Sequence, residues 1–228
     1  LKITIQQLND EIEYVKKLEG MRKEFIANFT HEIKTPLSII NGYIELIEAG
    51  KDDDKKQQYL SAIHQEIKHI NQLIMAMLDL SRLESGKVEL HKEDIDLEDL
   101  LMSIVETFAP ILKKKHIHVV MGDEFPHIQG DFKELKIVFQ NFMSNAIKHT
   151  PQNGHIYIKY HQGILSFENE GKPLSHEQKE TIWDTYVSSD RQGTGLGLAI
   201  CRSILELHGF QYDVCNSEKG VEFQIHIL

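Results

Sequence analysis

The sequence is poor in cysteine, in tryptophan and in long apolar runs. Cys201 and Cys215 are its two cysteines, which give neither a disulfide framework nor a metal-ligand spacing, so we expect a reducing compartment. No apolar run reaches the roughly 18 residues that a membrane-spanning helix needs, and no signal peptide is visible. The chain begins at Leu1 without Met, which is typical of a fragment.

Positive charge is also scarce. The 25 Lys and Arg residues are outnumbered by 35 Asp and Glu residues, for a formal net charge of -10. This balance argues against nucleic acid or an anionic membrane surface as the main partner. Hydrophobic residues make up 41% of the 228 residues, so we expect a globular chain long enough for one or two domains.

Proline is nearly absent from the first 84 residues, where Pro36 stands alone. This stretch has helical periodicity that breaks at AGKDDD (49–54), which we interpret as a turn between two helices. A second break, at ESGKVEL (84–90), precedes alternating helix and strand patterns. We therefore predict a helical hairpin at 1–85 and an α/β domain at about 88–228.

Both helices of the hairpin carry apolar residues at three- and four-residue spacing, which is typical of coiled-coil seams. One hairpin buries two such seams poorly, whereas two hairpins bury them in a dimeric four-helix bundle. The alternative is that the stripe packs on another domain. The seams are Leu1, Ile5, Leu8, Ile12 and Val15 in the first helix, and Leu60, Ile63, Ile67, Ile70, Ile74 and Met77 in the second.

His31 lies away from the apolar stripe of the first helix. At about 100° per residue it falls roughly 150° from the centre of that stripe, so we expect it to face solvent. Thr35 follows at i+4 on the same face, and Glu32 is within side-chain reach. An exposed imidazole beside a carboxylate can act as a nucleophile, although an ordinary surface histidine is the alternative in a chain with 13 of them. Pro36 removes an N–H from this turn, so we expect a bend.

The run FIANFTHEIKTPLSII (25–40) resembles the H-box of the sensor histidine kinases of bacterial two-component systems. The resemblance implies that His31 is phosphorylated from ATP and passes the phosphoryl group to an aspartate on the receiver domain of a response regulator. It makes Glu32 the acid/base that activates His31. It makes Thr35 the residue that helps to position water for dephosphorylation of the regulator.

The resemblance covers nearly the whole chain, since LIMAMLDLSRLESGKVEL (73–90) is similar to the end of the family's second helix and its linker. It implies a coiled-coil signalling helix at 1–20 and a dimerisation and histidine phosphotransfer domain at 21–85. It also implies an ATP-binding catalytic domain at 88–228, an α/β sandwich of the Bergerat type. The chain would act as a homodimer, as the cytoplasmic portion of a protein anchored in the membrane by an upstream segment.

The stretch FKELKIVFQNFMSNAIKHTP (132–151) predicts a helix with a polar face. Asn141, Asn145 and Lys148 lie on that face, about 140° from the apolar one. Amide oxygens are suitable Mg²⁺ ligands and lysine is a counter-charge for phosphate, although a solvated polar face is the alternative. The stretch resembles the family's N-box, and this likeness assigns Asn145 to Mg²⁺, with Asn141, Lys148 and His149 near the phosphates of ATP.

A glycine run opens the predicted helix in RQGTGLGLAICRSILELHG (191–209). Such a run lets backbone amides approach an anion at the start of a helix, and Gly209 is a stop signal. No G-K-[ST] follows and no strand of the dinucleotide-binding kind precedes, so neither a Walker loop nor a Rossmann motif fits. The run resembles the family's G2 box, and IWDTY (182–186) resembles its F-box. These likenesses assign Trp183, Tyr186, Gly193, Gly195, Leu196 and Gly197 to the nucleotide site.

The chain departs from the family at the G1 box, which usually reads D-N-G-x-G-I. The matching residues 169–174 read N-E-G-K-P-L, so Gly171 is kept and Pro173 replaces the second glycine. The amide oxygen of Asn169 can accept a hydrogen bond from the adenine amino group, more weakly than an aspartate because it is uncharged. Arg191 supplies the single positive charge of the short segment where the ATP lid is expected.

Two other functions stay open at this stage. ATP-hydrolysing relatives of gyrase and MutL types carry a water-activating glutamate at the position that resembles Asn141 here, which argues against a hydrolase. A degenerate nucleotide-binding scaffold, or a phosphatase-dominant regulator with weak kinase activity, is the other alternative. The altered G1 box and the short lid favour it, because an altered motif weakens a functional assignment.

Overall fold

The computed structural model describes residues 2–50, 53–86, 88–184 and 195–227. The chain divides into two compact units, Leu1–Met77 and Leu78–Leu228. Among the helices in the described residues, none combines the length and the apolar character needed to cross a membrane.

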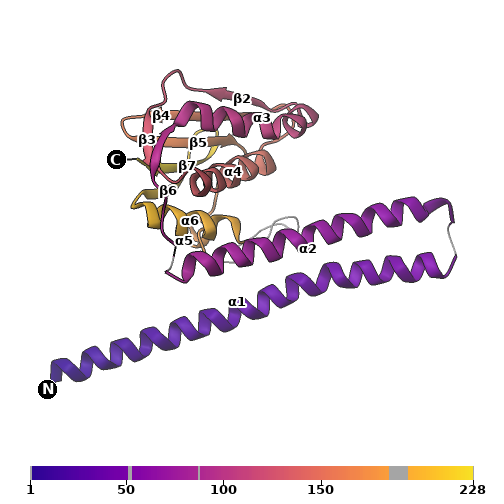
Figure 1. Ribbon diagram of the computed structural model, residues 1–228, viewed down its shortest axis with the longest axis horizontal. Helices are drawn as coiled ribbons and strands as arrows, with labels where there is room; N and C mark the ends of the chain where they lie inside the picture. Colours follow the sequence, from indigo (N-terminus) through magenta and orange to yellow (C-terminus); the bar gives the residue numbers. More distant parts are fainter. Residues whose placement is uncertain (1, 51–52, 87, 185–194, 228) are drawn as a thin grey trace. The chain divides into compact units, whose positions relative to one another are not determined.

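The first unit is built from two long helices, as predicted (Figure 1). Helix α1 spans Lys2–Glu48 and continues through Pro36. A short 3-10 helix, η1 (Asp53–Lys55), precedes α2 (Lys56–Glu84), so the helix break falls where AGKDDD predicted it. The rings of Tyr43 and Tyr59 stack with their centroids 5.5 Å apart, which brings the two helices together beside the turn.

The predicted seams leave large apolar side chains exposed in the single chain. Ile12 of α1 is 46% exposed and Ile67 of α2 is 45% exposed, and Val15, Leu60 and Ile74 are exposed as well. Side chains of this size at regular helical spacing favour burial against another helical surface. The exposure is what a hairpin of a four-helix bundle presents before it pairs, and the dimer itself stays a prediction.

The second unit is an α/β domain in which three longer helices accompany a five-stranded sheet. The sheet has the order β2-β4-β5-β7-β6, with β2 and β4 parallel and the other neighbours antiparallel, and β1 pairs with β3 separately. Its elements are β1 (Glu93–Asp96), α3 (Leu97–Lys115), β2 (His118–Met121), β3 (His127–Gly130), α4 (Phe132–His149), β4 (His155–His161), β5 (Ile164–Glu170), α5 (His176–Thr181), α6 (Gly197–His208), β6 (Gln211–Asn216) and β7 (Gly220–His226).

Helix α4 covers one face of the sheet and packs between α3 and α6. Phe142 of α4 contacts Phe167 of β5 and Phe223 of β7, at centroid distances of 5.6 and 5.2 Å. Successive strand residues alternate between faces, so Asn169, two residues after Phe167, lies on the face that α4 covers. The other face carries polar residues such as Tyr157 and Glu168. The helical hairpin followed by an α/β domain confirms the predicted fold class.

The compact units do not have the same bounds as the predicted domains. The units divide between Met77 and Leu78, within α2, and the predicted domain boundary at 85–88 stays a prediction. Leu80 and Leu83 are only 2% and 4% exposed, so the last turns of α2 are buried although they are helical. Periodicity identifies a helix but not the unit in which its side chains are buried.

His208 links the end of α6 to the start of α4. The backbone N–H of Asp131, the N-cap residue of α4, donates to Nε2 of His208 at 3.0 Å. Because Nε2 accepts this bond, the proton of the neutral ring lies on Nδ1, which donates to the carbonyl of Ile204 at 2.8 Å. A second ring proton would break the bond to Asp131, so the structure favours neutral His208.

We expect the second unit to lose stability in mild acid through His208. Burial is the main cause that lowers the pKa of His208, and the charge of Lys92 lowers it further. The bond to Ile204 and the carboxylates of Asp131 and Glu134 raise it, but the net shift is downward. The unfolded chain therefore binds the proton first, and stability falls as the pH drops below about 6.5, by at most about 1.4 kcal/mol per pH unit. Urea unfolding at pH 7.5 and pH 5.5 measures this effect. A His208→Gln variant with an equally steep pH dependence would contradict the assignment.

Candidate functional site

His31 is an exposed side chain on α1, as its position on the helix predicted. Its ring makes no hydrogen bond to another described residue, so both ring nitrogens are accessible. Thr35 is also exposed, and its hydroxyl donates to the His31 carbonyl at 3.2 Å. Glu32 is half-buried beside them. His64 of α2 is different, because its Nδ1 lies 2.8 Å from the Leu60 carbonyl.

The polar face of α4 carries two asparagines with different environments. The Nδ2 of Asn141 donates to the carbonyl of Ile137 at 2.9 Å, which fixes the orientation of that amide. Asn145 is half-buried, and its amide has no hydrogen-bond partner among the residues that the structure describes. Lys148 and His149 lie in the last turn of the same helix. Asn145 is therefore the amide on this face that is available to a ligand.

Helix α6 begins directly against Asn141. A Cβ atom at Gly197, the first residue of α6, would lie 2.5 Å from the Oδ1 of Asn141, so a larger residue would displace this amide. Gly195 has a φ of 63°, which also favours glycine. Leu196 is fully buried and makes no side-chain cap bond to α6. The structure thus brings the predicted N-box and G2 box together, and the start of α6 has the backbone access that an anion requires.

Asn169 of β5 is a buried polar residue, only 2% exposed. Its Nδ2 donates to the carbonyl of Glu170 at 3.1 Å, while its Oδ1 has no partner within the described part of the chain. A Cβ atom at Gly171 would lie 2.9 Å from the carbonyl oxygen of His149, so the G1 segment packs against the end of α4. Buried polar atoms are normally satisfied, so the free acceptor of Asn169 suits a ligand that donates, such as an adenine amino group.

Trp183 belongs to an aromatic cluster between α4 and the sheet. Its ring centroid lies 4.7 Å from that of Tyr212 and 5.7 Å from that of Phe223. The next residue, Asp184, forms an ion pair with Arg202 of α6 at 3.1 Å. This pair was not predicted from the sequence, because no motif links Asp184 to a residue 18 positions later. Tyr186, Arg191 and Gly193 lie outside the described residues.

The predicted site residues are better suited to bind a nucleotide than a metal ion held by protein ligands alone. Among the described residues, no group of three His, Cys, Asp or Glu side chains is placed to bind a metal ion. Mg²⁺ commonly uses one or two protein oxygens together with phosphate oxygens. Asn145 can supply such an oxygen, the start of α6 offers backbone N–H groups for phosphates, and Asn169 offers an acceptor for the base.

Comparisons with known proteins agree with this geometry. Residues 21–86 match the family model of the His Kinase A (phospho-acceptor) domain, and residues 130–228 match that of the histidine kinase-, DNA gyrase B- and HSP90-like ATPases. The sensor histidine kinase YclK of Bacillus subtilis (strain 168) is 30% identical over 98% of this chain and 49% of its own length. The chain therefore spans about half the length of this curated relative.

Solved structures give the same result. The catalytic domain of histidine kinase ThkA is 31% identical, with a TM-score of 0.55 over 61% of this chain and 95% of that one. Histidine kinase ThkA in complex with the response regulator TrrA is 28% identical, with a TM-score of 0.75 over 90% of this chain and 60% of that one. ShkA in complex with AMPPNP is 26% identical, with a TM-score of 0.66 over 87% of this chain and 44% of that one.

Proposed function

The chain belongs to the sensor histidine kinases of bacterial two-component systems, and from this premise we propose that it transfers the terminal phosphoryl group of ATP to His31. The observation that carries the proposal is that one chain holds an exposed imidazole in its phospho-acceptor segment and a nucleotide fold with an unfilled, buried amide acceptor. The similar structure of ShkA in complex with AMPPNP supports ATP as the donor.

In the proposed reaction, an unprotonated ring nitrogen of His31 attacks the γ-phosphorus in line. The new N–P bond forms as the bond to the bridging oxygen of ADP breaks, and ADP leaves with that electron pair. Glu32 accepts the proton of the other ring nitrogen, which keeps the phosphorylated ring neutral. Mg²⁺ would supply charge neutralisation of the phosphates, and Asn145 is the residue assigned to hold it.

Asn141 supports transfer to a side chain over hydrolysis by water. Its Oδ1 faces Gly197 and its Nδ2 is bonded to the Ile137 carbonyl, so the amide is held in place. An amide has no pKa in the range of a general base, and it cannot deprotonate an attacking water as a glutamate can. The γ-phosphate is then preserved for His31.

The proposed acceptor after His31 is an aspartate on the receiver domain of a response regulator. The complex of ThkA with the response regulator TrrA, together with the phospho-acceptor domain at 21–86, supports this partner. In the reverse direction Thr35, one helical turn from His31, would position water for dephosphorylation of the regulator. The homodimer is proposed from the exposed seams, and the membrane anchor stays a prediction from the family.

Incubation with γ-labelled ATP and Mg²⁺ tests the proposal. We expect one label per chain at most, stable in base and labile in acid, because a phosphoramidate hydrolyses in acid. Peptide mapping would locate the label at His31. ATP turnover without labelled protein would indicate a hydrolase, and nucleotide binding without label or turnover would indicate a scaffold.

Replacing Asn169 by aspartate tests the adenine contact. We expect Asn169→Asp to bind ATP about tenfold more tightly, because a charged acceptor makes a hydrogen bond stronger by about 1 kcal/mol or more. The same change places a second acceptor oxygen beside the Glu170 carbonyl, where Nδ2 now donates at 3.1 Å. The ligand-free variant should therefore unfold at a lower temperature. Titration with ATP and with GTP, plus a melting curve, measures both effects; unchanged ATP affinity would remove Asn169 from the base site.

A further inference from the structure

Arg82, in the last turn of α2, holds the first turn of α4 through a bidentate ion pair. Its Nη2 donates to Oε1 and Oε2 of Glu134 at 2.8 and 3.1 Å. The two partners are unequally exposed, since the side chain of Glu134 is 8% exposed and that of Arg82 is 46% exposed. A buried carboxylate without its cation is strongly disfavoured, so Glu134 makes the departure of Arg82 costly.

A second tether holds the chain that follows α2 to the same turn of α4. The backbone N–H of His91 donates to Oδ2 of Asp131 at 2.9 Å. The Oδ1 of that carboxylate accepts from the backbone N–H groups of Lys133 and Glu134, so one side chain caps α4 and holds the linker. Burial acts to raise the pKa of Asp131, but these three backbone hydrogen bonds lower it, and the net shift is downward, which keeps the carboxylate ionised at neutral pH.

The two tethers border an open cavity of about 410 Å³, lined among others by Arg82, Val88, His91, Asp131 and Glu134. We call the Arg82–Glu134 pair and the His91–Asp131 bond the α4 clamp. All of its residues belong to the second unit, although α2 begins in the first. The described residues at both ends of this segment are thereby tied to the first turn of α4, so the end of α2 and the start of α4 form one joint.

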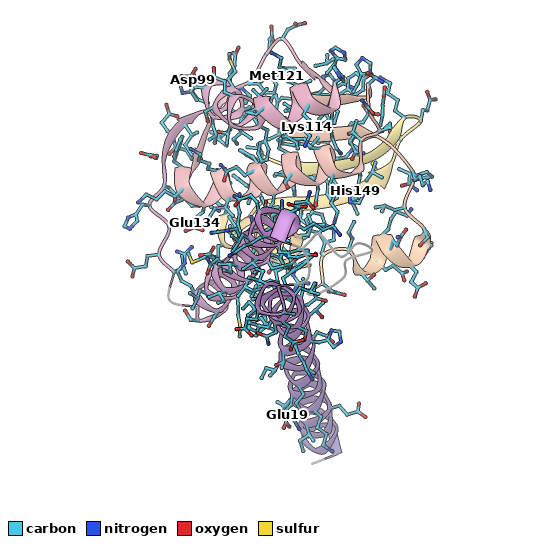
Figure 2. The ribbon with its side chains drawn as sticks, turned by 90° about the vertical axis from the view of Figure 1, so that its right-hand side faces the viewer. Glu19, Asp99, Lys114, Met121, Glu134 and His149 are labelled. Atoms are coloured by element: carbon cyan, nitrogen blue, oxygen red, sulfur yellow. The ribbon has the colours of Figure 1, made fainter. Side chains whose placement is uncertain are left out.

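The clamp grips α4 at the end away from the nucleotide residues. Glu134 and His149 lie at opposite ends of this helix (Figure 2). Asn145 follows Glu134 by 11 positions, which is about 16 Å along a helix. A change at Arg82 therefore leaves the groups that contact ATP in place. What it changes is how firmly α4 is joined to the helix that leads back to the hairpin of His31.

We propose, resting on the proposed kinase function, that Arg82 is a positioning residue for phosphoryl transfer. By clamping α4 to the end of α2, it limits the orientations in which bound ATP is presented to His31. Phosphoryl transfer depends on alignment of the attacking and leaving atoms, so a looser joint lowers the rate at saturating nucleotide. The residues assigned to the nucleotide belong to α4 and to the chain from β5 to α6, and none of them is part of the clamp, so nucleotide affinity is unaffected.

The test compares Arg82→Ala, Glu134→Gln and the double variant with Lys133→Ala, which removes one cation from the same cavity without touching the clamp. In Arg82→Ala we expect phosphorylation at saturating ATP to slow about tenfold, with the Kd for ATP changed less than about twofold. Because the two residues act as one pair, the double variant should be no slower than either single variant. Lys133→Ala should match the unsubstituted chain.

Hydrogen exchange separates this inference from the kinase assignment. The clamp predicts faster exchange of the His91 amide in Arg82→Ala, whether or not the chain phosphorylates itself. If the native chain takes up no phosphoryl label, the proposed function is wrong. If exchange of the His91 amide is unchanged in Arg82→Ala, the clamp is wrong. An unchanged or increased phosphorylation rate in Arg82→Ala, or a parallel loss of ATP affinity, would overturn the positioning role.

Discussion

His31→Gln is expected to abolish autophosphorylation, with a loss of at least about a thousandfold, because no other group then attacks the γ-phosphorus. The ring is exposed and makes no hydrogen bond to another described residue, so the substitution should change the unfolding free energy by no more than about 0.5 kcal/mol. Nucleotide affinity should be unchanged, since every residue assigned to the proposed ATP site belongs to the second unit. Acid-labile label measured beside ATP binding gives both results from one preparation.

His64→Gln is the matched control for this experiment. It removes an exposed helical histidine from the same hairpin, and its Nδ1 is already occupied by a contact of 2.8 Å with the Leu60 carbonyl. We expect it to keep nearly the full label. Acid-labile label that persists in His31→Gln and disappears in His64→Gln would move the acceptor to α2 and contradict the reading of the H-box.

Local signals in the sequence predicted the four helices α1, α2, α4 and α6, and the structure confirms them. Gly209 was expected to stop the helix after the glycine run, and α6 ends at His208 with Gly209 at a φ of 77°. Helix α4 spans Phe132–His149, within the stretch 132–151 that the polar and apolar faces indicated. Periodicity and caps depend on neighbours within a few residues, which a single sequence contains.

Contacts between distant segments could not be predicted in the same way. Gly197 meets Asn141 across a separation of 56 positions, and Arg82 meets Glu134 across 52. Family resemblance identified Gly197 as part of the G2 box. The structural reason for a glycine there, an amide oxygen at the place where a Cβ atom would lie, appears only in the folded chain. The Arg82 contact has no motif at all, because one basic residue near a helix end is common.

Asn145→Ala is expected to reduce autophosphorylation by about a hundredfold or more, since it removes the protein oxygen assigned to Mg²⁺ at the transferring phosphate. Unlike the neighbouring Asn141, which is bonded to Ile137, Asn145 makes no hydrogen bond to another described residue. Its loss therefore leaves no buried partner unsatisfied, and the melting temperature should stay close to that of the native chain. A large kinetic loss without a loss of stability is the signature of a ligand-binding role.

The dependence on Mg²⁺ distinguishes this role from a general effect on α4. In the native chain, Mg²⁺ should tighten ATP binding relative to ATP in excess chelator, because the ion links the phosphates to Asn145. In Asn145→Ala that difference should shrink, while affinity for metal-free ATP stays the same. Ser144→Ala, at the adjacent exposed position, is the control and should keep the full difference. If Asn145→Ala responds to Mg²⁺ as the native chain does, the ion is held elsewhere, and the polar face of α4 contributes charge and shape without coordinating it.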